Sequence, residues 1–372
     1  MDWRLIESDA ALAELLELAA GCTAVMVDTE FMRRNTFYPQ VALVQLCFAG
    51  TEAGGTAWLV DPLQIQNPEP LTRLLENPSV VKVLHSASED LEVFQHWLGV
   101  LPRPLFDTQK AAALVGLDFG LGYRAMVLEL CGEDLPKGET RSDWLQRPLT
   151  ESQCHYAAQD VSWLLDAYRI IDQRCREQGR YDWVLEDGEV ACAGLASNAG
   201  DYYKKIKSAW KLSPEQLATL IAICDWREVT AREKDKPRSW IIDDKACLQL
   251  AQNSPANMNE LRSVVEMHPS IVRRYGEVLL DLVAEQVPLA SNQLPPKLPP
   301  PLSASQRSQL KRLKQQTEKI AGQLGVAPQV LVASKDYEAL IRGDAEQPIT
   351  WSGWRQQRVI QPLRDFLKED AA

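Results

Sequence analysis

The residues in this sequence that could do chemistry are carboxylates at the end of an apolar run. Residues 25–27 are Val, Met and Val, and Asp28-Thr29-Glu30 follows them. In a strand, residues two apart point to the same side, so Asp28 and Glu30 share a face while Thr29 points away. Two like charges at the edge of a sheet raise each other's pKa unless a cation lies between them. The pair predicts a divalent-metal site, although a strand that ends in solvent would carry the same two acids.

Asp90 is a third candidate carboxylate, at the start of an expected helix. Ser86 and Glu89 have the S-x-x-E spacing of a capping box, in which Glu89 reaches back to the Ser86 amide. This use of Glu89 leaves Asp90 free to project toward the carboxyl edge of the sheet. The alternative role for Asp90 is a favourable charge near a helix N-terminus.

Asp160 is the fourth, in a helix expected over residues 151–177. Thr150 and Gln153 form a second capping-box pattern, and this pattern sets the phase of the helix. Tyr156 and Asp160 then lie one turn apart on one face, next to two alanines. The pair could pack against a ligand or be an ordinary, partly buried contact. The four histidines show no mutual ligand spacing, and we interpret them as structural.

The elements that must position these residues are predicted to form a mixed α/β sheet of about five strands. Residues 1–21 are expected to be a surface helix, with Ser8 as N-cap and Gly21 as its end, and not a signal peptide. The sequence patterns predict strands at 25–31, 41–48, 56–60, 80–84 and 105–106, with helices at 70–76, from 86, and at 108–115, 121–131 and 151–177. The first three strands are expected to be antiparallel, and βαβ connections are expected to follow.

Length and charge indicate several domains of different character. The chain has 372 residues, enough for two or three domains. Residues 1–200 have a net charge of −15 and residues 201–372 one of +4. This asymmetry fits a metal-using catalytic half joined to a mildly basic accessory half, although a solvated acidic surface would look the same.

Cysteine spacing and hydropathy indicate the cellular compartment of the protein. The eight cysteines are scattered with no C-x-x-C pair, which argues against a zinc site and a disulfide framework. No apolar run approaches the roughly 20 residues needed to span a bilayer. We therefore expect a cytoplasmic protein with no membrane association and no obligate protein partner.

Taken together, Asp28-x-Glu30, Asp90 and Tyr156-x-x-x-Asp160 resemble the three exonuclease motifs of the DEDD superfamily, in its tyrosine-bearing subgroup. The sequence around these motifs resembles bacterial ribonuclease D over nearly the whole chain. The matching segments are VDTEF at 27–31, TFYP at 36–39, VQL at 44–46, HSASEDL at 85–91, FDTQ at 106–109, SDWLQRPL at 142–149 and YAAQDV at 156–161. The resemblance implies a ribonuclease-H-like catalytic domain over residues 1–200. It also implies stepwise hydrolysis of RNA from a free 3′ end to nucleoside 5′-monophosphates, with tRNA precursors and other small stable RNAs as substrates.

The chemistry implied by this resemblance uses two divalent ions. Ligands that are all oxygen suit Mg²⁺ or Mn²⁺, and two such ions roughly 3.5–4 Å apart can stabilise the attacking and leaving oxygens of a phosphoryl displacement. In that scheme Asp28, Glu30, Asp90 and Asp160 hold the metals, and Tyr156 orients the attacking water. The alternatives are a DNA-directed 3′–5′ exonuclease, because the motifs cannot sense a 2′-hydroxyl, and a non-catalytic RNA-binding protein on the same fold.

The second half of the chain is predicted to contain two small all-α bundles. Residues 225–242 resemble the HRDC domain, expected over 205–287, and include the basic residues Arg232, Lys234, Lys236 and Arg238 between Trp226 and Trp240. We predict that the basic residues contact phosphates and that the tryptophans stack on bases. The alternative is buried tryptophans with a solvated rim of charges.

A stiff linker and a second, divergent HRDC-like bundle are expected after this domain. Six of the fourteen residues in 288–301 are Pro, which predicts an extended linker. Residues 302–370 lack the Asp-Lys-Pro-Arg motif of the first bundle. Packing against the catalytic half is therefore as good an expectation for them as contact with nucleic acid.

Overall fold

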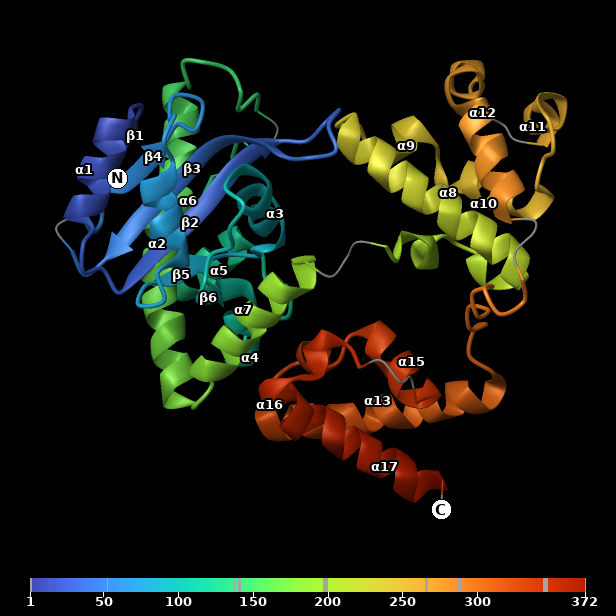
Figure 1. Ribbon diagram of the computed structural model, residues 1–372. Coiled ribbons are helices and arrows are strands. Elements are labelled where there is room, and N and C mark those ends of the chain that lie inside the picture. Colours follow the sequence, from blue (N-terminus) through green and yellow to red (C-terminus); the bar gives the residue numbers. More distant parts are fainter. Residues whose placement is uncertain are drawn as a thin grey trace. The chain divides into compact units, whose positions relative to one another are not determined.

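The computed structural model describes residues 2–51, 53–136, 138–139, 142–196, 200–264, 267–286, 290–343 and 347–371. The chain forms two compact units (Figure 1). The sheet unit comprises Met1–Met32, Pro39–Leu195 and Leu302–Ala372, and the helical unit comprises Arg33–Tyr38 and Ala196–Pro301. None of the helices in the described ranges is long and apolar enough to cross a membrane.

A six-stranded mixed sheet organises the sheet unit, in the order β1-β4-β3-β2-β5-β6. Its strands are β1 (Trp3–Ile6), β2 (Ala24–Met32), β3 (Gln40–Ala49), β4 (Ala57–Val60), β5 (Val81–Leu84) and β6 (Leu105–Asp107). The antiparallel β2-β3-β4 meander was predicted and is confirmed. The other pairs, β1 with β4, β2 with β5 and β5 with β6, are parallel.

The sequence analysis was wrong about the first residues of the chain. Residues 3–6 form the edge strand β1, paired with β4 through Trp3 and Ala57, and only Asp9–Leu18 forms the helix α1. The side chain of Ser8 accepts a hydrogen bond from the Ala11 amide, so the predicted N-cap is confirmed. A four-residue strand has too little alternation to be distinguished from the helix that follows it.

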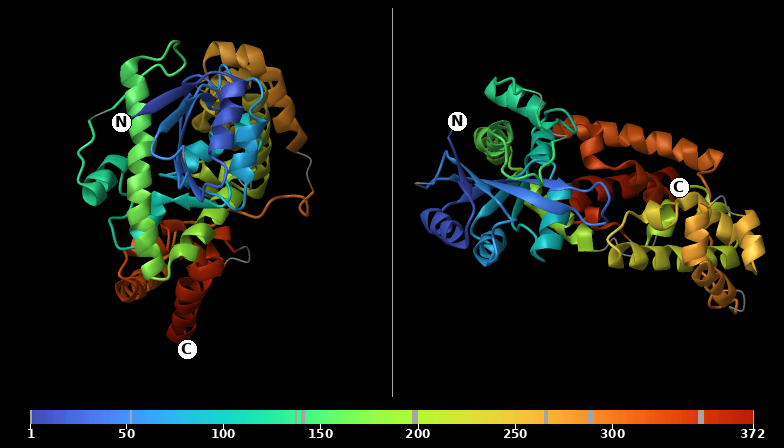
Figure 2. Two further views of the ribbon diagram at one scale, coloured as in Figure 1. Left: turned by 90° about the vertical axis from the view of Figure 1, so that its left-hand side faces the viewer. Right: turned by 90° about the horizontal axis from the view of Figure 1, so that it is seen from above.

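Helices cover both faces of the sheet (Figure 2). Helices α1, α2 (Glu69–Glu76) and α3 (Ser88–Trp97) bury the face that includes Val25 and Val27. Helices α4 (Thr108–Leu114), α5 (Tyr123–Cys131) and the long α6 (Glu151–Glu177) bury the face that includes Met26. Even-numbered residues of β2 therefore face α6, and Asp28 and Glu30 continue that row beyond Met26.

Two helix starts show what local sequence can and cannot specify. The capping box of Thr150 and Gln153 is present at the start of α6, as predicted. The predicted box of Ser86 and Glu89 is wrong, because Ser86 has φ +61° and the N-cap of α3 is Ala87. The carboxylate of Asp107 at the end of β6 instead accepts hydrogen bonds from the amides of Ser86, at 3.0 Å, and Ala87, at 3.3 Å. This tertiary contact fixes the turn that precedes α3, and the local capping box does not form.

The C-terminal segment packs on the sheet unit through α7 (Tyr181–Ala196). The segment contains α13 (Ala304–Leu324), α14 (Pro328–Leu331), α15 (Ser334–Arg342), η3 (Ile349–Trp351), α16 (Gly353–Arg355), η4 (Gln356–Ile360) and α17 (Gln361–Ala371). Arg355 binds Asp187 through two hydrogen bonds, at 2.6 and 3.0 Å. Trp354 stacks on Trp183 with ring centroids 4.5 Å apart. Packing against the first half, one of the two expectations for this segment, is therefore observed.

The helical unit is a small bundle built around α8 (Pro214–Glu233). Its other elements are η1 (Tyr202–Lys205), η2 (Ala209–Lys211), α9 (Arg238–Ile241), α10 (Asp244–Asn253), α11 (Met258–Val264) and α12 (Pro269–Gln286). Trp226 packs edge-on against Tyr275 at the margin of the bundle core, whereas Trp240 is 57% exposed. Of the predicted linker, residues 290–301 are described and contain no helix or strand, and Pro288 lies outside the described residues.

Candidate active site

Three of the predicted carboxylates meet on one face of the sheet. One oxygen from each of Asp28, Glu30 and Asp160 lies within 4.8 Å of the other two. Strand β2 presents Asp28 and Glu30, and α6 packs against the same face and presents Asp160. All three donors are hard oxygens at a spacing that one cation can bridge, so the residues fit a divalent metal.

The electrostatics of this cluster also favour a cation. Burial, together with the charge of Asp160, raises the pKa of Asp28 to about 8. Burial and the charges of Asp28, Asp160 and Asp90 raise the pKa of Glu30 to about 10. Burial raises the pKa of Asp160 to about 8, although a hydrogen bond from Tyr156 acts in the opposite direction. The cluster therefore retains protons at neutral pH until a cation replaces them.

Asp90 reaches the site from the opposite face of β2. The hydroxyl of Thr29 donates a hydrogen bond to Asp90 Oδ1 at 2.5 Å, and both side chains are buried. Burial and the charge of Asp28 raise the pKa of Asp90 well above its usual range. Asp90 is not part of the three-carboxylate group, but it is close enough to raise the pKa of Glu30.

Thr29 is a site residue that the sequence analysis missed. Alternation along β2 correctly predicts that Thr29 points away from Asp28 and Glu30. Its contact with Asp90 joins residues 61 positions apart, and no local pattern indicates such a pairing. The only available signal is that a polar residue occupies an otherwise apolar face of the strand.

Tyr156 lies beside Asp160 in a cavity of about 340 Å³. The cavity is lined by Tyr123, Arg124, Leu135, Pro136, Gly138, Tyr156, Gln159 and Asp160. Burial and the surrounding carboxylates raise the pKa of Tyr156, so the phenol stays protonated and can donate a hydrogen bond. Gly138 lies against the ring, and a Cβ added there would be 1.7 Å from Tyr156 Cε2. Only glycine fits at this approach.

Gln45 lies opposite Asp28 in the β2–β3 register. Its side chain is completely buried, and neither polar atom of its amide has a hydrogen-bond partner among the described residues. Buried amides without partners are rare and costly. Because directly paired residues of antiparallel strands project to the same face, the Gln45 amide is a donor and acceptor available beside the carboxylates.

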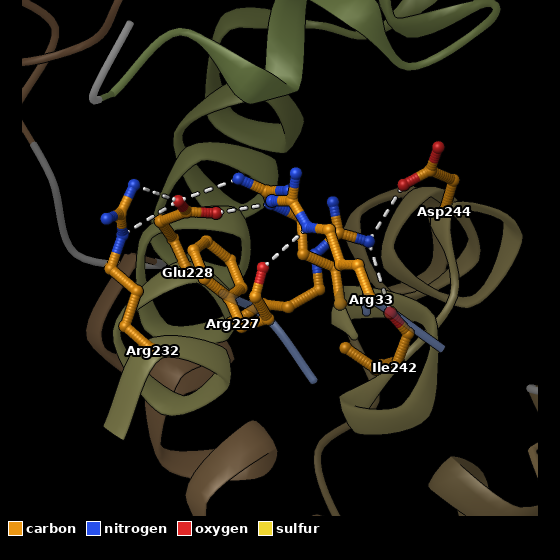
Figure 3. Close-up of polar contacts among 8 residues, drawn as sticks. Arg33, Arg227, Glu228, Arg232, Ile242 and Asp244 are labelled. Atoms are coloured by element: carbon orange, nitrogen blue, oxygen red, sulfur yellow. Dashed lines mark hydrogen bonds and ion pairs between the residues drawn. The ribbon is translucent and has the colours of Figure 1, made fainter. Parts of the chain in front are cut away.

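The four predicted RNA-contacting residues lie at the end of α8 and the start of α9. Arg232 and Arg238 both bind the carboxylate of Glu228, and Figure 3 shows Glu228 with the guanidinium group of Arg232 on one side. Lys236 Nζ donates to the Asn35 carbonyl at 3.3 Å, and Lys234 is exposed at the C-cap of α8. Two of the four charges are therefore already paired, and contact of these residues with RNA stays a prediction.

Comparisons with known proteins show the family of the chain. A family profile described as 3′-5′ exonuclease matches residues 3–175, and one described as HRDC domain matches residues 216–283. The ribonuclease D of Pseudomonas paraeruginosa is 42% identical over 370 residues, which cover 98% of this chain and 97% of the relative. The chain belongs to the ribonuclease D family. The ribonuclease D of Escherichia coli is 34% identical over 378 residues, which cover 99% of both chains.

A solved structure supports the same assignment across both units. The crystal structure of Escherichia coli ribonuclease D, described as an exoribonuclease involved in structured RNA processing, matches with a TM-score of 0.92 at 33% identity and covers 99% of each chain. The predicted fold class, an α/β sheet domain followed by helical bundles, is confirmed. The chain is a 3′–5′ exoribonuclease that acts on RNA, and its exonuclease domain is of a metal-dependent type.

Proposed function

We propose that this exoribonuclease uses two divalent ions, Mg²⁺ or Mn²⁺, to remove nucleoside 5′-monophosphates one at a time from the 3′ end of RNA. The observation that supports this most directly is the convergence of Asp28, Glu30 and Asp160 within 4.8 Å of one another. Their raised pKa values point the same way, because half-buried carboxylates this close need a cation to ionise together. Asp90, behind Asp28 on the other face of β2, would complete the ligand set.

Each side chain has a separate task in this scheme. The ions, when bound, would supply charge stabilisation for the attacking and leaving oxygens. Asp28 would be the central carboxylate that holds the metal, because the charge of Asp160 raises its pKa and its own charge raises the pKa of Asp90. Tyr156 remains a neutral phenol that holds and orients the attacking water, and Thr29 fixes the orientation of Asp90. No protein nucleophile is required.

We propose tRNA precursors and other small stable RNAs as the substrates. The description of the Escherichia coli relative as an enzyme of structured RNA processing supports a folded RNA with a free 3′ end. A cytoplasmic location fits this role and the eight free cysteines. We propose that the chain acts without an obligate protein partner.

The test is an incubation of the purified chain and Mg²⁺ with 5′-labelled RNA and with DNA of the same sequence. We expect a ladder of one-nucleotide steps on RNA alone, and no products in excess EDTA. Equal ladders on RNA and DNA would support a DNA-directed exonuclease, and undiminished hydrolysis in EDTA would eliminate the metal mechanism. Asp28→Asn serves as the inactive control, since it keeps the side-chain shape but removes a metal-binding charge.

A further inference from the structure

The segment that joins β2 to β3 belongs to the helical unit and not to the sheet unit. Residues Arg33–Tyr38 cluster with Ala196–Pro301, although they connect two strands of the sheet. Arg33 is only three residues after Glu30, and the β2–β3 register shifts between Glu30 and Phe31. Whatever holds this segment therefore acts on the end of the strand that presents two of the proposed metal ligands.

Asp235 holds the backbone of this segment directly. Its Oδ1 accepts hydrogen bonds from the amide of Phe37 at 2.9 Å and from the amide of Tyr38 at 3.0 Å. Hydrogen bonds to an ionised carboxylate are roughly twice as strong as neutral ones. Asp235 lies in the left-handed backbone region, with φ +46°, immediately after the C-cap of α8. An unusual backbone conformation is thus maintained at the residue that makes this contact.

The Phe37 side chain is held as well. It is buried in the core of the helical unit, and the guanidinium carbons of Arg232 and Arg238 lie 4.8 and 4.6 Å from the centre of its ring. Glu228 binds both arginines and so orients them over the ring, and Figure 3 shows its contact with Arg232. Burial raises the pKa of Glu228, but hydrogen bonds and charge from Arg238 and Arg232 outweigh burial and leave that pKa below its usual value.

A hydrogen bond within the segment completes the arrangement. Arg33 Nε donates to the Phe37 carbonyl at 2.9 Å, as Figure 3 shows for the labelled Arg33. The Thr36 hydroxyl donates to the Tyr38 carbonyl at 2.7 Å. The bundle therefore holds the segment at the amide and the ring of Phe37, and Arg33 braces it internally at the Phe37 carbonyl.

We propose that Asp235, together with the Glu228, Arg232 and Arg238 cluster, forms a clasp that holds Arg33–Tyr38 and thereby positions Glu30 and Asp28 for metal binding. These are positioning residues of the helical unit that act through the backbone of β2. The proposal rests on the metal site proposed above. It assigns to Arg232 and Arg238 a role different from the phosphate contacts predicted from the sequence.

The test compares Asp235→Gly with Ser254→Gly in the full-length chain. Glycine accepts a positive φ, so Asp235→Gly removes the acceptor without adding backbone strain. Ser254 has φ +43° at the end of α10 in the same unit, is exposed, and serves as the matched control. Asp235→Asn keeps an oxygen that can accept hydrogen bonds from both amides, so we expect it to retain most of the Mn²⁺ affinity that Asp235→Gly loses.

Hydrogen exchange and metal affinity carry the test, and neither depends on turnover. We expect hydrogen exchange at the Phe37 and Tyr38 amides to be faster in Asp235→Gly and unchanged in Ser254→Gly. We expect the affinity for Mn²⁺, measured by electron paramagnetic resonance, to fall about tenfold, the usual scale for loss of a group that supports metal ligands. With RNA present and Mn²⁺ saturating, kcat should return close to the wild-type value, because the ligands themselves are intact.

The outcomes separate the clasp from the metal mechanism. Unchanged Mn²⁺ affinity in Asp235→Gly, with faster exchange at the two amides, would overturn the positioning role. Unchanged exchange would overturn the contact itself. Wild-type protein that binds no Mn²⁺ would overturn both the proposed metal mechanism and the clasp. If Asp235→Gly does not fold, Glu228→Gln replaces it, since it keeps the shape of the cluster while removing the charge that orients the arginines.

Discussion

At the scale of single residues, Tyr156 shows how burial decides which chemistry a side chain can do. A phenol near neutral pH is already a weak acid, and burial with three nearby carboxylates makes its ionisation harder still. Tyr156 donates its one proton to Asp160, so its oxygen can position a water by accepting a hydrogen bond, but it does not act as an anionic base. This restriction matches a reaction in which the metals activate the water.

We predict that Tyr156→Phe lowers kcat by about 10²–10⁴, the usual scale for a positioned proton-handling group. The ring and its contact with Gly138 remain, so Mn²⁺ affinity and thermal stability should stay close to wild type. Single-turnover hydrolysis of an RNA oligonucleotide at saturating metal measures the effect. Tyr123→Phe is the control in the same cavity, because its hydroxyl donates to the Gln159 carbonyl at 2.8 Å. A normal rate per folded molecule of Tyr156→Phe would show that Tyr156 is structural.

We predict that Thr29→Val weakens metal binding about tenfold, because it removes the hydroxyl that orients Asp90 while keeping the shape of the side chain. Calorimetric titration with Mn²⁺ measures this change. Thr23→Val is the control, since Thr23 is exposed just before β2. Equal affinities of the two variants would mean that Asp90 needs no support from Thr29.

At the scale of elements, β2 and α6 bring three carboxylates together, and their pKa values predict how stability depends on pH. In the unfolded chain these groups titrate near pH 4, whereas in the fold Asp28 and Asp160 titrate near 8 and Glu30 near 10. A native state that binds more protons than the unfolded state loses stability as pH rises. The contribution of the cluster is therefore complete below about pH 4 and is lost as pH rises through 8 to 10.

We predict that the melting temperature in EDTA falls as pH rises from about 5 to 9, and that the increase caused by Mg²⁺ becomes larger over the same range. Metal binding must displace protons at the low end of this range and does so less at the high end. Scanning fluorimetry at several pH values measures both trends. Asp28→Asn should flatten both trends. A melting temperature in EDTA that rises with pH in the wild type would contradict the raised pKa values.

Elements that depend on local contacts could be predicted from the sequence, and those that depend on distant contacts could not. The start of α6 was predicted because Thr150 and Gln153 are three residues apart. The predicted start of α3 was wrong because Ser86 has a positive φ and its amide donates to Asp107, which is 21 residues away in the chain. The pairing of Arg232 with Glu228, four residues earlier on α8, was accessible to sequence reasoning as an i,i+4 pair. The burial of Phe37 between two arginines was not, because it joins segments about 200 residues apart in the chain.

At the scale of the whole molecule, the C-terminal segment is part of the sheet unit. Asp187 is buried and receives hydrogen bonds from both Arg355 and the Trp354 indole. We predict that Arg355→Ala destabilises the fold by about 3 kcal/mol, because it leaves the buried Asp187 carboxylate without its cationic partner. Urea unfolding measures the change. Lys368→Ala, which breaks an exposed pair with Asp365, should change the stability much less. Equal effects would show that the Asp187 pair does not stabilise the unit.

The last prediction distinguishes residues that bind a folded RNA from residues that position the metal site. Arg232 and Arg238 bind Glu228 and lie over Phe37, whereas Lys234 and Trp240 are exposed beside them and take no part in that cluster. We predict that Lys234→Gln with Trp240→Leu weakens binding to a tRNA-sized RNA. The slope of log K against log salt should become shallower by about 1, as expected for one lost phosphate contact.

The same double variant should bind Mn²⁺ normally, and the clasp variant Asp235→Gly should show the opposite pattern, with weaker Mn²⁺ binding and an unchanged salt slope. Lys335→Gln, an exposed charge on α15 of the sheet unit, is the control for loss of one positive charge. Binding of the large RNA by the double variant with wild-type affinity and slope would mean that this surface does not contact RNA. The helical unit would then contribute to catalysis only through its hold on Arg33–Tyr38.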